Sequence, residues 1–269
     1  MKICLLNLSG NVGKSTLAVH LLAAFTPGAR IVSVESINAS ASNEVEGLDV
    51  QELGASRFKE IFREIMRSEQ IIVDVGASNV AAFMGEMRRF QSAVGEFDLV
   101  LVPTVPADKQ QRDTIATIDW LHGLGIDPSK VRVIFNQYAC DALDPLPVVF
   151  AQVFGYAASD GRGKAIFEPH AVIDRNEAYE LAKESGRTVR ELAQSRTDWR
   201  AVRLQAKQAG DMEALEHAMA AQMTHDLAIT AQQNLARVHA MLFPQGTPDT
   251  GAVREETRQC EASGGRKRA

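Results

Sequence analysis

A glycine-rich segment near the amino terminus has the residue types of a phosphate-binding loop. Residues 7–16 are NLSGNVGKST, in which two glycines precede lysine, serine and threonine. Glycines let the backbone turn tightly so that successive N–H groups point at phosphate oxygens, and the end of the following helix adds partial positive charge. In such a loop Lys14 reaches the β and γ phosphates and the Ser15 hydroxyl holds Mg²⁺. The alternative interpretation is a chance Gly-Lys-Ser turn.

A second candidate group follows an apolar run. Asp74 comes directly after the apolar residues 71–73. An acid at the end of a buried strand can bind a water molecule on Mg²⁺. An acid after an apolar strand is common by itself, so the prediction depends on the loop as well. Ser15 and Asp74 are the predicted metal-binding residues.

Apolar runs of strand length alternate with amphipathic stretches of helix length around these groups. The alternation predicts parallel strands joined by helical crossovers, and near-continuous Val, Ile and Leu runs suit strands covered on both faces of a doubly wound α/β sheet. The loop then follows the first strand and opens the first helix, as a phosphate-binding loop requires. Predicted strands are 2–7, 30–34, 70–75, 98–103, 131–136 and 164–168, and predicted helices are 14–25, 56–67, 79–94 and 108–124.

The composition is that of a globular protein. Of 269 residues, 45% are apolar and 23% are charged, which excludes disordered and collagen-like chains. The net charge of -5 excludes a uniformly basic nucleic-acid-coating protein. The three cysteines, Cys4, Cys140 and Cys260, form no Cys-x-x-Cys pair and indicate a reducing compartment. Since we find neither a signal-peptide core nor about 18 consecutive apolar residues, we expect a cytoplasmic protein without a membrane partner.

The character of the chain changes after about residue 197, where Ala, Gln and Met are enriched. An apolar stripe there predicts one long helix, whose stripe either packs on its own domain or forms a dimer or partner interface. We expect an α/β domain over 1–195, a helical extension packed on or next to it over 196–243, and a disordered tail over 244–269. The stripe comprises Met212, Leu215, Met219, Met223, Leu227, Ala231, Leu235, Val238 and Leu242.

Basic residues gather just before that helix. Arg196, Arg200, Arg203 and Lys207 are spaced to align on one helix face, provided that the helix begins early enough. Such a face is either an ordinary solvated surface or a non-specific DNA contact, whose affinity would fall steeply with salt.

Two stretches resemble a known class of proteins. The loop SGNVGK at 9–14 and the sequence VESIN at 34–38 are similar to the StbB group, the plasmid stability and conjugation proteins within the ParA/MinD class of deviant Walker A P-loop ATPases. The resemblance implies a mostly parallel P-loop NTPase sheet over about residues 1 to 195, ATP or ADP with Mg²⁺ as cofactors, and hydrolysis of ATP. It also implies a small DNA-binding partner protein encoded nearby, and it makes a homodimer a candidate assembly.

The resemblance extends the set of site residues. Asn136 matches the position where related ATPases use an asparagine to read the adenine edge, and a strand-terminating turn is the alternative. Pro169 follows the predicted strand 164–168 and is expected beside the base. The implied nucleotide contacts are Ser9, Gly10, Asn11, Val12, Gly13, Lys14, Ser15, Thr16, Asn136 and Pro169.

Two departures from the class predict slow hydrolysis. Ser9 stands where the class has a lysine that reaches a partner's phosphate, and Ile37 stands where it has the aspartate that orients the attacking water. The first acid of that pair is Glu35, which either points toward Mg²⁺ or ends a strand in solvent. Losing one stabilising group costs about 10²–10³ in rate.

The predicted catalytic residues are accordingly Lys14, Asp74 and Glu35, in an ATPase or ATP-dependent switch with slow turnover. Two alternatives stay open. The first is an interaction protein that nucleotide stabilises without appreciable hydrolysis. The second is a metabolic ATP-dependent ligase or kinase on the same fold, which would need an acceptor pocket and a base.

Overall fold

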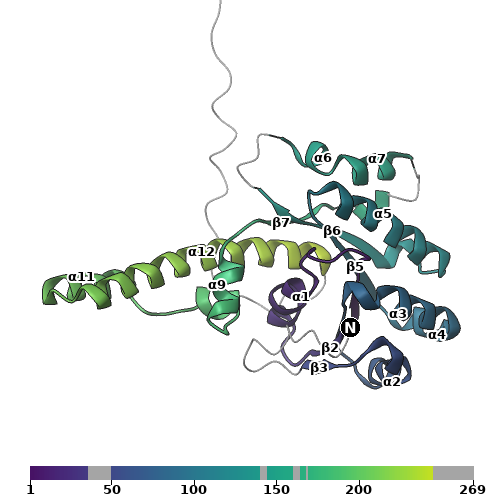
Figure 1. Ribbon diagram of the computed structural model, residues 1–269, viewed down its shortest axis with the longest axis horizontal. Coiled ribbons are helices and arrows are strands. Elements are labelled where there is room, and N and C mark those ends of the chain that lie inside the picture. The colour runs from purple at the N-terminus through teal and green to yellow at the C-terminus, as the bar shows by residue number, and fades with distance from the viewer. Residues whose placement is uncertain (36–49, 140–143, 160–163, 168, 245–269) are drawn as a thin grey trace, which may run out of the picture.

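A parallel β-sheet runs through the centre of the molecule (Figure 1). The computed structural model describes residues 1–35, 50–139, 144–159, 164–167 and 169–244. Within these ranges the sheet has seven strands in the order β3-β2-β4-β1-β5-β6-β7, and every neighbouring pair is parallel. The predicted doubly wound α/β fold is thereby confirmed. The strands are β1 (Lys2–Leu5), β2 (Arg30–Val34), β3 (Val50–Glu52), β4 (Ile71–Val75), β5 (Leu99–Thr104), β6 (Val131–Tyr138) and β7 (Ala171–Asp174).

Both faces of this sheet are buried. Successive side chains of a strand point to opposite faces, so Cys4 and Leu6 enter one apolar cluster while Ile3 and Leu5 enter another. This two-sided burial explains why the central strands are almost wholly apolar, and β4 and β5 are buried at every position. The apolar runs that predicted strands are therefore a consequence of helices on both faces.

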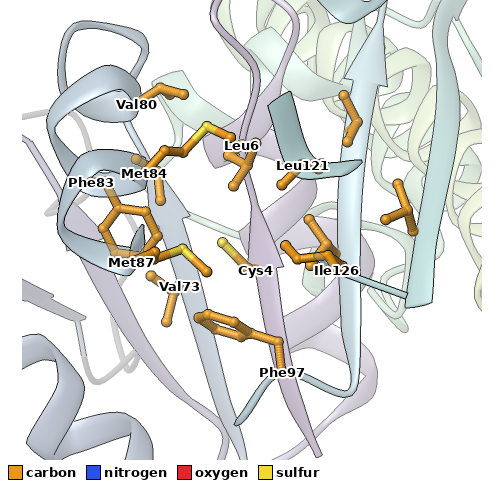
Figure 2. Close-up of a cluster of buried hydrophobic side chains, with 14 of the residues drawn as sticks. Cys4, Leu6, Val73, Val80, Phe83, Met84, Met87, Phe97, Leu121 and Ile126 are labelled. Carbon is orange, nitrogen blue, oxygen red and sulfur yellow. The ribbon is translucent and has the colours of Figure 1, made fainter. Parts of the chain in front are cut away.

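The first cluster lies between the sheet and helices that follow β3, β4, β5 and β6. Figure 2 shows Phe83, Met84 and Met87 over Cys4 of β1 and over Leu6, which follows that strand. The covering helices are α2 (Phe58–Arg67), α3 (Ala77–Arg89), α4 (Gln91–Glu96), α5 (Asp108–Gly123) and α7 (Ala151–Ser159).

The opposite face is covered by the first helix and by the carboxy-terminal helices. The helix predicted over 14–25 forms as α1 (Lys14–Leu17), a π-helical segment η1 (Ala18–Leu22) and a 3₁₀ turn η2 (Ala23–Phe25). Buried His20 of η1 accepts a hydrogen bond at Nδ1 from the Val189 backbone N–H at 3.3 Å. Burial lowers the pKa of His20 to about 4, so the ring is neutral at physiological pH and can accept this bond. The other covering helices are α9 (Ala178–Glu184), α10 (Val189–Ala193) and the second half of α12 (Met212–Leu242).

The long helix predicted from the apolar stripe is confirmed as α12, but the stripe has two environments. Leu235 and Val238 are buried against the sheet, whereas Met212 and Met223 are exposed. The first half of α12 pairs instead with α11 (Trp199–Ala209), and the two form a hairpin that projects from the sheet (Figure 1). None of the helices in the described ranges has both the length and the apolar character needed to span a bilayer.

The strand predicted at 164–168 is wrong. Lys164–Phe167 forms the short helix α8, and residue 168 lies outside the described residues. The apolar residues at 165–167 are too few for periodicity to separate a strand from a buried helix segment, and the seventh strand begins only at Ala171. The edge strand β3 was missed because three residues are too short for a periodic signal. The tail expected beyond Pro244 also lies outside the described residues.

Truncating the aromatic centre of the first cluster tests this packing. Phe58 is 1% exposed and contacts the rings of Phe62, Phe83 and Phe90. We expect Phe58→Ala to lower the free energy of unfolding by about 3–5 kcal/mol, because transfer and cavity terms add. Met66→Ala on the same helix is the control, since Met66 is 49% exposed and should change stability by less than about 0.5 kcal/mol. Equal losses in urea denaturation of the two variants would contradict this packing.

Candidate nucleotide-binding site

The loop between β1 and α1 contains two residues with left-handed backbone. Asn11 and Gly13 have φ values of 58° and 83°. Glycine adopts this conformation at little cost and asparagine tolerates it. Gly13 is the N-cap of α1, so the first free N–H groups of the helix face the loop. The predicted contacts from Ser9 to Thr16 therefore form one continuous loop and helix start.

Hydrogen bonds to β5 and α5 fix the first half of this loop. The Asn7 amide donates from Nδ2 to the Pro103 carbonyl and to Thr114 Oγ1, both at 2.8 Å, and Asn7 Oδ1 accepts from the Ser9 N–H at 2.7 Å. The Leu8 N–H donates to Thr117 Oγ1 at 3.1 Å. Sequence reasoning missed the anchors Pro103, Thr114 and Thr117 because their bonds to the loop join segments far apart in the chain.

The Lys14 side chain lies inside the loop rather than in solvent. It is 8% exposed, and its Nζ donates to the Ser9 carbonyl at 2.9 Å and to the Asn7 carbonyl at 3.4 Å. Burial lowers the pKa of Lys14, and the negative charges of Asp74 and Glu35 oppose this shift. The ammonium group is thus held against the carbonyl groups at the start of the loop.

Asp74 is a buried acid beside that ammonium group. It is the fourth residue of β4, it pairs in register with Leu5 of β1, and it is 3% exposed. Burial raises the pKa of Asp74 to about 6, although the Ser15 side chain and the Lys14 charge act in the opposite direction. Its Oδ1 is buried without a hydrogen-bond partner.

The residues at this point fit a magnesium ion. A carboxylate oxygen and the Ser15 hydroxyl are the hard oxygen donors that Mg²⁺ prefers, and Mg²⁺ is typically held by one or two such groups together with phosphates and water. The unpartnered Oδ1 of Asp74 is a buried acceptor that a metal-bound water could satisfy.

Glu35, at the end of β2, lies against Gly76. A Cβ atom at Gly76 would be 2.7 Å from Glu35 Oε1, so only glycine leaves room for this carboxylate. Burial raises the pKa of Glu35, the Lys14 charge lowers it, and the Glu52 charge raises it further. Glu35 is therefore within electrostatic reach of Lys14, and its catalytic role stays a prediction. Ile37 lies outside the described residues.

Asn136 connects the end of β6 to the loop. Its Nδ2 donates to the Val12 carbonyl at 2.9 Å, and its Oδ1 accepts from the Gln137 N–H at 2.9 Å. A Cβ atom at Gly13 would be only 2.3 Å from Asn136 Nδ2. The amide thus braces the loop, a role that neither of the sequence-based interpretations of Asn136 included.

A cavity of about 290 Å³ opens beside the loop, between the ends of β6 and β7. It offers amide, carboxylate and guanidinium groups from the segment after β7, which sequence reasoning missed because it placed the last strand at 164–168. Pro169 precedes β7 and is not among the lining residues. The cavity is lined by Gly13, Thr16, Leu17, Asn136, Gln137, Ile173, Asp174, Arg175, Asn176, Glu177, Tyr179 and Glu180.

The basic cluster lies away from this site, on α11. The helix begins at Trp199, because the Asp198 side chain caps it by accepting from the Ala201 N–H at 2.9 Å. Arg196 therefore precedes the helix, so the condition for its sharing one helix face with Arg200, Arg203 and Lys207 is not met.

No protein-family model matches the sequence, and no curated protein matches it. Several solved structures have a similar fold. The cell division ATPase MinD of Pyrococcus furiosus is 13% identical over 88% of this chain and 98% of its own, with a TM-score of 0.52. MinD of Aquifex aeolicus is 14% identical over 92% and 98%, with a TM-score of 0.50. A Cyanothece McdA–ATP complex is 16% identical over 71% and 89%, with a TM-score of 0.45.

The fold is that of the ParA/MinD P-loop NTPases. At 13–14% sequence identity, the similarity to these solved structures extends to the fold alone. The chemistry of the site therefore depends on the residues described above.

Gly13 provides a test of the loop geometry. Gly13→Ala should weaken the binding of a fluorescent ATP analogue by about tenfold or more, because alanine in left-handed backbone costs about 1–2 kcal/mol and its Cβ would also displace Asn136. Gly85→Ala is the matched control, since nothing lies within 4 Å of its added Cβ. Unchanged binding by Gly13→Ala would show that this backbone is not the binding surface.

The raised pKa of Asp74 gives a second test. Burial favours the protonated form of Asp74, whose pKa is about 6 in the folded protein and 3.8 in the unfolded chain. The resulting stabilisation is fully present below pH 3.8 and is lost as the pH rises through 6. From pH 4 to pH 7.5 the wild type should therefore lose about 2.5 kcal/mol of unfolding free energy relative to Asp74→Asn. Urea denaturation at both pH values measures this difference. If the difference in unfolding free energy between the wild type and Asp74→Asn does not change with pH, the pKa of Asp74 is not raised by burial.

Proposed function

We propose that this chain is an ATP-dependent switch of the StbB type that acts in plasmid stability, partition or conjugative DNA transfer. The observation that supports nucleotide binding best is the convergence of Lys14, Ser15 and Asp74 at the adjacent ends of β1 and β4. The StbB-type role is supported by the resemblance of the SGNVGK and VESIN stretches. We also propose a cytoplasmic location, because the number and spacing of the cysteines indicate a reducing compartment.

Binding is explained by the loop itself. The N–H groups from Gly10 to Ser15 bind the phosphates, and Lys14 exchanges its loop carbonyl partners for phosphate oxygens. Ser15 and Asp74 hold Mg²⁺, which when bound neutralises charge on the transferred phosphoryl group. The cavity after β7 accommodates the nucleoside, with Asn176 and Glu177 among its polar groups.

Hydrolysis is proposed to be slow. Phosphoryl transfer depends mainly on positioning and on charge stabilisation. A serine at position 9 supplies no positive charge, and isoleucine at position 37 cannot orient water. Glu35 is a carboxylate near Asp74 that could position a water molecule.

Ser9 and Ile37 also favour a second candidate function. In it, ATP stabilises the conformation of the chain that binds its partners, and ATP is hardly hydrolysed. The proposed partners are a small DNA-binding protein and a second copy of this chain, and non-specific DNA is the alternative partner for the basic residues of α11. The structure offers exposed Arg200 and Lys207 for such a contact.

Thermal unfolding and phosphate release together test these proposals. ATP with Mg²⁺ at about 100 times its Kd should stabilise the wild type by about 2.7 kcal/mol, a shift of several degrees in Tm. Lys14→Ala should abolish this shift, because the buried ammonium is lost. Phosphate release by the wild type should be slow but above that of Lys14→Ala.

Lys59→Ala, which removes an exposed lysine on α2, is the matched control and should behave as the wild type. A Tm shift with phosphate release at the Lys14→Ala level would assign the second candidate function. No shift with ATP or ADP would overturn nucleotide binding altogether.

A further inference from the structure

The hairpin of α11 and the first half of α12, residues 199–226, is called the arm below. It projects from the body of the molecule (Figure 1). Its helices approach through small residues, since Ala206 is 7% exposed and Ala218 is fully buried. The ring of Trp199 lies edge-on to His217 with centroids 6.4 Å apart. These contacts hold the arm together and leave its outer surface unoccupied by the described part of the chain.

Three methionines form an exposed face on α12 of the arm. Met212, Met219 and Met223 are 64%, 37% and 60% exposed. At about 100° per residue their spacing places them on one side of the helix, away from Ala218. Flexible, polarisable methionine side chains are favoured where a surface binds another helix. An exposed apolar face of this kind is typical of a surface that binds another molecule.

The charges on the two helices of the arm have opposite signs. Residues 211–226 include four Asp or Glu residues and no Lys or Arg, whereas α11 contains Arg200, Arg203 and Lys207 and no acid. Leu204, which is 49% exposed, accompanies the basic residues of α11. In the described part of the chain, none of these charged groups forms an ion pair.

The basic and acidic faces lie on the same side of the arm. From the buried Ala206, Lys207 is rotated by about 100° around α11. From the buried Ala218, Met219 and the acid Asp226 are rotated by about 100° and about 80° in the same sense around α12. In antiparallel helices, equal rotations away from the line of contact bring both side chains to one side of the pair. One broad surface of the arm is therefore half basic and half acidic.

We propose that this surface binds the same surface of a second copy of the chain. A two-fold axis parallel to the arm places α11 of each copy over α12 of the other. Leu204 then contacts the methionines of the partner, and Arg200 and Lys207 face Glu216 and Asp226 of the other copy. The interface needs no nucleotide and does not depend on the proposed function.

The distribution of charge favours a second copy over DNA as the occupant. A DNA-binding surface must meet phosphates with positive charge throughout, and the acidic half of this surface would be repelled. A second copy instead offers each charge its opposite across the interface. DNA binding by α11 is therefore the alternative that the experiment below must distinguish from self-association.

A charge-swap experiment tests this arrangement. The full chain carries Lys14→Ala throughout, so that nucleotide plays no part, and its mass is measured by light scattering and sedimentation. We expect a dimer that dissociates as salt is raised. Arg200→Glu with Lys207→Glu should weaken self-association about 100-fold, and so should Glu216→Lys with Asp226→Lys, because like charges would face each other. An equimolar mixture of the two double variants should dimerise again.

Helical circular dichroism and Tm should match between variants, and Lys59→Glu should leave the dimer unchanged. A parent chain that is monomeric at high micromolar concentration overturns the proposal, and so do charge variants that dimerise normally. If the parent is monomeric but binds DNA, and Arg200→Glu with Lys207→Glu loses that binding, α11 is assigned to DNA instead.

Discussion

The buried ammonium of Lys14 and the buried carboxylate of Asp74 constrain the rest of the site. Either charge alone would be costly to remove from water, and each stabilises the charged form of the other. The parallel register of β1 with β4 brings them together, because Leu5 is paired with Asp74 and the loop starts directly after β1. The loop carbonyls, the Asn136 brace and the bonds from Asn7 then complete the surroundings of the ammonium group.

This arrangement explains which parts of the molecule could be predicted from the sequence. The central strands are apolar on both faces, so their runs are unmistakable, and the loop is a local motif whose glycine and lysine positions lie within ten residues. β7 is short and only alternately buried, with Ala171 and Ile173 inward, and its three apolar residues at 171–173 equal the three at 165–167, so no local pattern separated the strand from the helix. Because β7 was not predicted, the cavity formed by the segment after β7 was not predicted either.

Other features depend on tertiary contacts that no local pattern records. Asn136 and Val12 are 124 residues apart, and their hydrogen bond exists only because β6 ends near the loop. The division of α12 into a packed half and a projecting half also depends on tertiary contacts. The same periodic stripe continues through both halves, and only the position of the sheet edge decides where Leu235 is covered and Met223 is not. Whether Arg196 belonged to a helix was likewise decided by one capping residue, Asp198.

The π-helical segment η1 gives the loop a mechanical link to the carboxy-terminal helices. It continues α1 without a break, and its His20 holds the first residue of α10, which in turn packs on α12. A shift of the loop along its helix must therefore be absorbed within η1 or transmitted toward the arm. π-Helical turns are found frequently at functional sites. Because binding free energies are linked, any influence of loop occupancy on the arm is matched by an equal influence of the arm on the loop.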